Sequence, residues 1–274
     1  MLKKISIYAL SILIGLVFIV SAYSKLFPIE PFEYLLVDAG ISNWQFSIFI
    51  SRVIIALEFY IGALMIIQYK LRSFTTKFSI FTLLIFIIQL FHTIVTKGNQ
   101  GDCGCFGQLI SMTPLQAIIK NIVLIIFNLI LFKFSNDKLV KFKSIPFYLA
   151  LTSLTIVFIS NPVDLNYSKT YLNKPFDNFK LDIDTLYHSK SDKFDSPKIE
   201  LRKGKHIICF MSSTCNHCKI AAQKLKVIKK KNPSIPIYFF INGDTKDIEH
   251  FIKKTECKNI LYSKLNNHFF FPIV

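Results

Sequence analysis

Long apolar runs separated by short polar segments make up the first 160 residues of the chain. A helix that crosses the hydrocarbon core of a bilayer needs about 20 mainly apolar residues. We expect membrane spans at about residues 5–23, 46–69, 78–95, 115–132 and 145–160, of which the last is the shortest. Val20-Ser21-Ala22 would fit a signal-peptidase site, but the first apolar run is longer than usual for a signal peptide, so we interpret it as a retained helix.

The pattern changes after Ser160. A polar connector runs to about Lys205, and the short apolar runs 206–211 and 235–241 are typical of buried strands. Apolar residues recur at helical spacing from Cys215 to Lys231, and a further helix is expected over 245–254. The chain is therefore predicted to be an α-helical membrane bundle followed by an α/β domain.

The charge of the chain has an uneven distribution that indicates its orientation. Nine of the thirteen Lys and Arg residues before position 161 lie at the amino terminus or in the segments after the second and fourth spans. By the positive-inside rule these segments are cytoplasmic, so the loop after the third span and everything after Ser160 face outside. The net charge of +16 would suit nucleic-acid binding, but no base-reading or stacking motif accompanies it, and we predict no nucleic-acid partner.

Six cysteines include two close pairs, a grouping that does not resemble a disulfide scaffold. In the second pair, a predicted strand delivers Cys215 to the start of a helix, where amide groups and the helix dipole favour a thiolate. We expect Cys215 to be the nucleophile and Cys218 the resolving thiol, with His217 as a supporting cation. Half of a zinc site is the alternative, but no second ligand pair completes it, and no metal is predicted. Cys209 is expected in the core, and Cys257 has no assigned role.

The first pair, Cys103 and Cys105, lies in the loop after the third span, with Gly104 between the two thiols. Glycine allows a tight turn, and the small ring of a Cys103–Cys105 disulfide would be strained and easily reduced. A copper or zinc ligand pair and a simple structural turn are the alternatives; His92 is the nearest candidate for a third metal ligand.

Polar residues inside membrane spans are costly and mark candidate functional positions. Glu58 lies near the middle of its span, and Arg52, His92 and Lys120 lie nearer the outer end of theirs. We expect Glu58 either to be protonated or to pair with one of these three, in a role in helix locking or proton handling; the alternative for Arg52 and Lys120 is that they only extend outward to the membrane surface.

The residues around the second pair resemble a thioredoxin-like domain of the TlpA type, over roughly 170–274. The resemblance is carried by Lys203-Gly204-Lys205 and by the run from Cys209 to Lys219, which contains Cys215-Asn216-His217-Cys218. Thioredoxin-like folds add a cis-proline loop, two strands and a helix after this point. Since the chain stops two residues after Pro272, we expect an incomplete domain, with Pro272 as one candidate for the cis-proline.

The membrane region resembles the DoxX/MauE-like family over about residues 1–135. Its most specific signature is Cys103-Gly104-Cys105-Phe106-Gly107, and the segments 18–26 and 57–62 contribute too. Members similar to MauE are associated with disulfide formation in exported proteins beside a thioredoxin-like partner. The resemblances imply a four-helix transmembrane domain at 1–135, a fifth transmembrane helix and connector at 136–168, and a thioredoxin-like domain at 169–274.

Together these features predict a thiol–disulfide oxidoreductase of the bacterial inner membrane that acts on exported proteins in the periplasm. Cys103 and Cys105 would exchange electrons with Cys215 and Cys218. A quinone is a candidate terminal electron carrier, although no motif marks a site for it, and the direction of electron flow stays open. The alternatives are a copper-handling membrane protein that serves exported enzymes and a non-enzymatic scaffold with Cys103–Cys105 as a structural clip.

Overall fold

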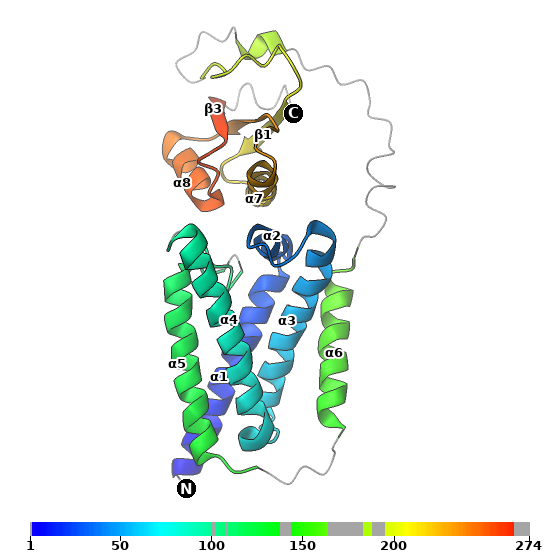
Figure 1. The fold of residues 1–274 in the computed structure, drawn as a ribbon, viewed down its shortest axis with the longest axis vertical. Helices are drawn as coiled ribbons and strands as arrows, with labels where there is room; N and C mark the ends of the chain where they lie inside the picture. Colours follow the sequence, from blue (N-terminus) through cyan, green and yellow to red (C-terminus); the bar gives the residue numbers. More distant parts are fainter. Residues whose placement is uncertain are drawn as a thin grey trace. The chain divides into compact units, whose positions relative to one another are not determined.

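The computed structural model describes residues 2–99, 102–107, 109–137, 144–163, 183–187 and 195–265 (Figure 1). It divides into two compact units, Met1–Val163 and Asp164–Val274. The first unit is helical, and the second contains a small sheet with helices. Pro272 lies outside the described residues.

The first unit is built from six α-helices and a short π-helical turn within the described residues. They are α1 (Leu2–Leu26), α2 (Glu30–Asp38), α3 (Trp44–Ile66), the turn Leu71–Thr75, α4 (Thr76–Lys97), α5 (Pro114–Phe134) and α6 (Ile145–Ser160). Four stretches are long and apolar enough to cross a membrane: Ile5–Leu26, Trp44–Ile66, Leu71–Thr96 and Pro114–Phe134. The first four predicted spans are thus confirmed as long apolar helices, and α6 is a shorter apolar helix.

Local capping explains where two of the helices begin. The side chain of Asn43 accepts hydrogen bonds from the N–H groups of Gln45 and Phe46 at the start of α3. Thr113 and Gln116 form a reciprocal capping box at the start of α5. Helix α2 was not predicted, because its nine residues are too short and too polar to read as a span. It nevertheless packs on the bundle through buried apolar residues such as Phe32 and Leu36.

Helices α1 and α3 touch through their backbones at two glycines. A Cβ added to Gly15 would lie 2.8 Å from the carbonyl oxygen of Gly62, and one added to Gly62 would lie 2.8 Å from that of Gly15. Apolar residues on both sides of this contact fill the bundle core, among them Ile14, Phe18, Ile61 and Met65. The close approach fixes how far α1 can slide along α3.

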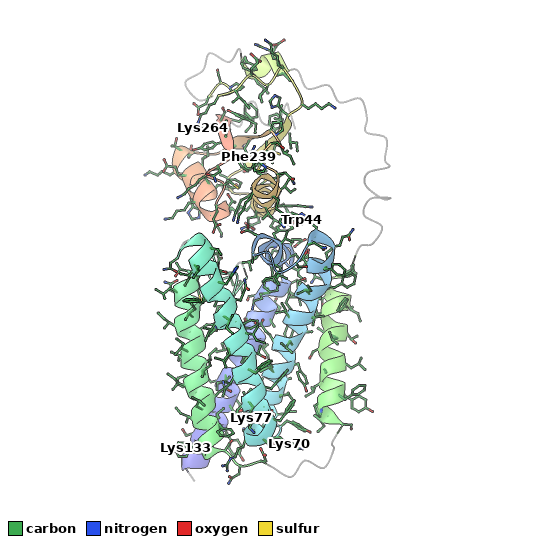
Figure 2. The ribbon with its side chains drawn as sticks, in the orientation of Figure 1. Trp44, Lys70, Lys77, Lys133, Phe239 and Lys264 are labelled. Carbon is green, nitrogen blue, oxygen red and sulfur yellow. The ribbon has the colours of Figure 1, made fainter. Side chains whose placement is uncertain are left out.

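Positive side chains gather at one end of the helical unit. Figure 2 shows Lys70, Lys77 and Lys133 at one end of the bundle and Trp44, the first residue of α3, at the other. The three lysines come from the segment before α4, the first turn of α4 and the last turn of α5. This segregation agrees with the sequence pattern from which we predicted the orientation.

The second unit contains a parallel sheet of three strands, in the order β1–β2–β3, within the described residues. Its elements are β1 (Ile207–Ser212), α7 (Asn216–Lys231), β2 (Ile237–Asn242), α8 (Thr245–Thr255) and β3 (Leu261–Leu265). The predicted strands and helices are confirmed to within two residues, and β3 is an addition. The sequence did not reveal β3 because it is short and mixes polar and apolar residues.

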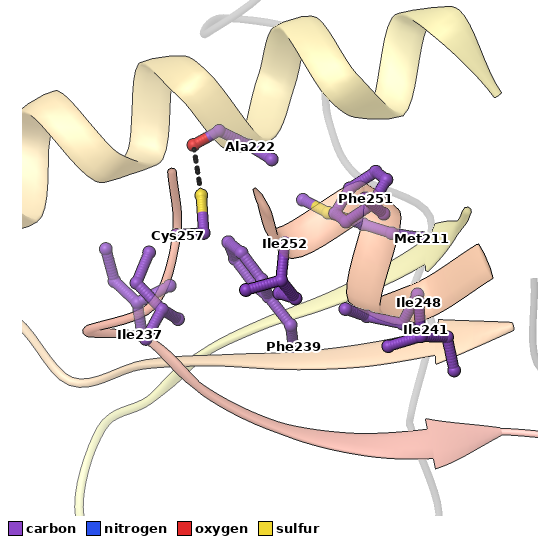
Figure 3. Packing of buried hydrophobic residues seen from close by; sticks show 10 residues of the cluster. Met211, Ala222, Ile237, Phe239, Ile241, Ile248, Phe251, Ile252 and Cys257 are labelled. Carbon is purple, nitrogen blue, oxygen red and sulfur yellow. Dashed lines mark hydrogen bonds between the residues drawn. The ribbon is translucent and has the colours of Figure 1, made fainter. Parts of the chain in front are cut away.

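Both faces of this sheet are covered. On one face, Ile237, Phe239 and Ile241 of β2 pack against Ile248 and Phe251 of α8, as Figure 3 shows. On the other face, Tyr238, Phe240 and Leu265 meet Leu186 and Leu201, which belong to the predicted connector. Part of the connector, including the 3₁₀ turn Ile183–Leu186, is therefore a layer of the domain.

Candidate functional site

The second cysteine pair lies where β1 passes into α7. Cys215 is the N-cap of α7, and its Sγ accepts a hydrogen bond from the N–H of Cys218 at 3.3 Å. The first N–H groups of a helix have no intrahelical partner, so a thiolate at this position accepts hydrogen bonds that would otherwise be unmade. The predicted strand–turn–helix arrangement around this pair is confirmed.

The two thiols of this pair differ in acidity. Hydrogen bonds from the Cys218 thiol and backbone lower the pKa of Cys215, and the Lys219 ammonium adds to the effect. Burial, followed by the hydrogen bond to Cys215, raises the pKa of Cys218. Cys215 is thus the thiol that is more readily ionised, and Cys218 is the one that keeps its proton.

Three further residues of the second unit, His217, Cys209 and Cys257, differ in their exposure. His217 is exposed in the first turn of α7, and its backbone N–H helps to lower the pKa of Cys215. Cys209 is half-buried on β1 and packs against the core, and burial raises its pKa to about 11. Cys257 is 1% exposed, and its Sγ lies 3.4 Å from the carbonyl oxygen of Ala222 (Figure 3). These contacts place both single cysteines in the packing of the domain.

The first pair lies in the loop between α4 and α5. Cys103 is buried against Leu90 and Ala117, and its N–H donates to the carbonyl oxygen of Met112 at 2.8 Å. The N–H of Cys105 points at the Sγ of Cys103 across 3.3 Å. Gly104, at a φ of +65°, makes the turn between the two cysteines. The backbone therefore brings the two thiols together, as the spacing predicted.

A second glycine holds this loop against α1. Gly107 has a φ of +52°, and a Cβ added to it would fall 1.8 Å from the carbonyl oxygen of Ser24. Only glycine allows the loop backbone to approach the helix so closely. The loop is thus seated directly on the last turns of α1.

The loop thiols also differ in acidity. A hydrogen bond from the Cys103 thiol lowers the pKa of Cys105 to about 7, against the effect of burial, with further lowering by Lys120 and Lys25. The same hydrogen bond and burial raise the pKa of Cys103. Cys105 is therefore the member of the pair that ionises first.

Next to this loop lies a buried polar cluster that the sequence did not reveal, formed by Ser21, Lys25 and Glu58. The Lys25 Nζ lies 2.7 Å from both carboxylate oxygens of Glu58 and 2.7 Å from the Ser21 Oγ. The Ser21 hydroxyl lies 2.9 Å from the carbonyl oxygen of Cys105 and 3.2 Å from Glu58 Oε1. The expectation that Arg52, His92 or Lys120 pairs with Glu58 was wrong: the partner is Lys25, which lies two residues after the end of the first predicted span.

The other candidate residues in the spans have different surroundings. Arg52 forms an ion pair with Glu33 at 2.7 Å and donates to the carbonyl oxygens of Asn161 and Ile48. His92 is exposed on α4. Lys120 lies over the ring of Phe106, with Nζ 4.6 Å from the ring centroid. Of the polar span residues singled out from the sequence, Lys120 and Glu58 thus lie beside the cysteine loop.

The alternative role of the cysteines, as metal ligands, requires a third donor nearby. Among the residues that the structure describes, no group of three or more His, Cys, Asp or Glu side chains is arranged to hold a metal ion. The thiols of Cys103 and Cys105 contact each other, and the carboxylate of Asp102 in the same loop accepts a hydrogen bond from the N–H of Gly104.

Comparisons with known proteins give one family match and one similar protein. Residues 3–134 match the family described as "Methylamine utilisation protein MauE". The chain is also 29% identical to "Protein TlpB" of Flavobacterium psychrophilum over 300 aligned positions, which cover 90% of this chain and 80% of that protein. No solved structure matches. The amino-terminal region is therefore MauE-like, and its apolar helices make the chain a multi-pass membrane protein.

Proposed function

We propose that this MauE-like membrane protein is a thiol–disulfide oxidoreductase that acts on exported proteins. The observation that carries the proposal is the matched asymmetry of its two cysteine pairs. In each pair, one thiol has a lowered pKa and its neighbour a raised one: Cys215 with Cys218, and Cys105 with Cys103. An attacking thiolate beside a protonated resolving thiol is what disulfide exchange requires.

The exchange follows from these roles. The Cys215 thiolate attacks one sulfur of a partner disulfide, forms a mixed disulfide and releases the other sulfur as a thiolate. Cys218 then loses its proton and attacks Cys215, which releases the second partner sulfur and leaves a Cys215–Cys218 disulfide. Two electrons pass to the partner, and the reverse sequence oxidises it. The potentials of the two couples set the direction.

Cys103 and Cys105 are proposed as the second redox pair of the same chain. In the exchange between the pairs, one disulfide is reduced as the other forms, so no external oxidant or reductant enters that step. The family match supports this role because its range, residues 3–134, includes the loop that contains these cysteines. In this proposal the first pair belongs to a transmembrane domain at 1–135, and the second pair belongs to a thioredoxin-like domain at 169–274. A fifth span and connector at 136–168 join the two domains.

The proposed orientation brings both pairs into one compartment. We infer a cytoplasmic amino terminus, with the cysteine loop and the residues after Ser160 on the periplasmic side of a bacterial inner membrane. The lysines gathered at one end of the bundle, including Lys70, Lys77 and Lys133, support this orientation (Figure 2). Helix α6 would supply the fifth crossing, with 16 residues.

A trapping experiment tests the proposal. In the Cys218→Ser variant, the mixed disulfide at Cys215 cannot be resolved, so it accumulates and can be identified by mass spectrometry after thiols are blocked. We expect Cys215 linked to Cys103 or Cys105, and to exported proteins. The double variant Cys215→Ser/Cys218→Ser is the control and should trap nothing. Absence of any mixed disulfide would favour the scaffold role. Copper in the purified protein that is lost in the Cys103→Ser/Cys105→Ser variant would favour metal handling.

A further inference from the structure

We propose that Lys25, fixed in place by Glu58 and Ser21, is a positioning residue that selects Cys105 as the attacking thiolate of the loop pair. The inference rests on the proposed thiol exchange at that pair and assigns a role to a cluster that the exchange itself does not use. Residues of the bundle would thus determine which thiol of the loop ionises first.

The ammonium group of Lys25 is held by a complete set of acceptors. Lys25 has three N–H donors, and the three acceptors around it are the two oxygens of Glu58 and the hydroxyl of Ser21, each at 2.7 Å. Lys25 is 4% exposed and Glu58 is 2% exposed. Every donor is satisfied and the side chain cannot reach water, so its charge is held at one place in the bundle.

A hydrogen bond and a close backbone contact connect this charge to the cysteine loop. Ser21 accepts from Lys25 and lies 2.9 Å from the carbonyl oxygen of Cys105. One turn later on α1, Ser24 carries the carbonyl oxygen on which Gly107 packs. The loop is therefore attached to α1 at the turns that hold Lys25, and its distance from the charge is set by backbone contacts.

Charged groups from three helices act on Cys105. Its thiol is acted on by Cys103 in the loop, Lys120 from α5, Lys25 from α1 and Glu58 from α3. Glu58 opposes ionisation of Cys105, but its effect is smaller than that of Lys25. Asp102, in contrast, acts on Cys103 and opposes its ionisation. The fixed charges thus favour a thiolate at Cys105 and disfavour one at Cys103.

Stability alone gives little reason for the cluster. Burying an ion pair in an apolar bundle costs desolvation that its attraction scarcely repays, and apolar replacements of such pairs are often neutral or stabilising. A function at the adjacent thiol accounts for keeping the pair. When Cys105 ionises, its proton passes to water and the thiolate attacks one sulfur of an incoming disulfide, while Cys103 keeps its proton until it resolves the product.

The test measures the acidity of Cys105 directly. Alkylation of Cys105 by iodoacetamide is followed against pH in the full-length, reduced Cys103→Ser protein, with mass spectrometry to read that site. Adding Lys25→Met/Glu58→Gln should raise the midpoint, because the lost effect of the Lys25 charge is larger than the lost opposing effect of Glu58. Adding Lys25→Arg/Glu58→Gln should lower it instead, since a cation then remains without its carboxylate.

Controls separate this role from a structural one. The double variant Arg52→Met/Glu33→Gln removes a second ion pair of the bundle, in which Arg52 also donates to the carbonyl oxygens of Asn161 and Ile48. This variant should leave the alkylation midpoint of Cys105 unchanged. A merely structural cluster would shift both Lys25 variants in the same direction, or neither, and either result overturns the proposal.

A second comparison needs no change in the bundle. The alkylation midpoint of Cys103 in Cys105→Ser protein should lie above that of Cys105 in Cys103→Ser protein, and an equal or lower value would contradict the selection of Cys105. These measurements do not depend on exchange with Cys215. Failure of the trapping experiment and failure of this inference are therefore distinguishable.

Discussion

The N–H of Cys218 lies 3.3 Å from the Sγ of Cys215, which is the N-cap of α7. The hydrogen bond ties the acidity of one cysteine to the fold of the helix that carries the other. Hydrogen bonds from the Cys218 thiol and from the backbone N–H groups at the start of α7 lower the pKa of Cys215, whereas burial and the hydrogen bond to Cys215 raise the pKa of Cys218. Reactivity and local structure can therefore be tested together.

The alkylation of Cys215 should have a midpoint below that of an ordinary cysteine, about 8.5. Because the pKa of Cys215 is lowered, its thiolate is present at lower pH, and the rate should reach half its maximum there. In Cys215→Ser protein, Cys218 should react with a higher midpoint. Rapid alkylation with iodoacetamide and peptide mass spectrometry measure both values, and a reversed order would contradict the assigned roles.

Gly107→Ala should loosen the cysteine loop. The added Cβ would meet the Ser24 carbonyl oxygen, and the positive φ adds strain, for a combined cost of about 2 kcal/mol or more. Gly40→Ala is the matched control, because Gly40 has a φ of +74° but a Cβ there meets nothing within 4 Å. We expect a larger drop in melting temperature for Gly107→Ala than for Gly40→Ala, which carries the strain of a positive φ without the clash, and faster proteolysis in the cysteine loop for Gly107→Ala alone.

Lys25→Met alone should destabilise the helical unit far more than Lys25→Met/Glu58→Gln. The single change leaves a buried carboxylate without its cation, at a cost of about 3–5 kcal/mol, whereas the double change removes both charges. Denaturant unfolding in detergent gives the two free energies. The partly exposed pair Lys226–Glu256 is the contrast: Lys226→Gln should cost about 1 kcal/mol or less. Equal losses for the single and double Lys25 variants would contradict the pairing.

Cys257→Ala should leave thiol exchange intact. Its thiol packs in the core of the second unit against α7, and its pKa is raised chiefly by burial. We expect a loss of stability of about 1 kcal/mol from the lost contacts, with unchanged trapping in the Cys218→Ser background. Loss of the mixed disulfide in a folded Cys257→Ala protein would show that this thiol takes part in the exchange.

Much of the fold could be predicted from local pattern. The first four spans are long apolar runs, and the strands and helices on both sides of Cys215 follow the periodicity of their apolar residues. Cys103 and Cys105 could be paired because Gly104 places them within one turn. Each of these features depends on residues close together in the sequence, where spacing alone determines which side chains meet.

The rest depends on contacts between distant segments. Lys25 and Glu58 are 33 positions apart on different helices, and no local rule relates them. A lysine near the end of a span also resembles a flanking charge, so the sequence does not indicate that Lys25, and not Arg52 or His92, is the partner of Glu58. Helix α2 and strand β3 are short, and their packing against other elements explains why they form.

The contact between Gly15 and Gly62 fixes the distance between α1 and α3 and their relative position along the helix axes. Glu58 lies about one turn from this contact along α3, so the contact also determines where Glu58 lies relative to α1. Any larger residue at either glycine would push the helices apart and draw Lys25 away from its carboxylate. Substitutions at these two positions should therefore change the chemistry of a loop that neither glycine touches, and natural variation at one should accompany variation at the other.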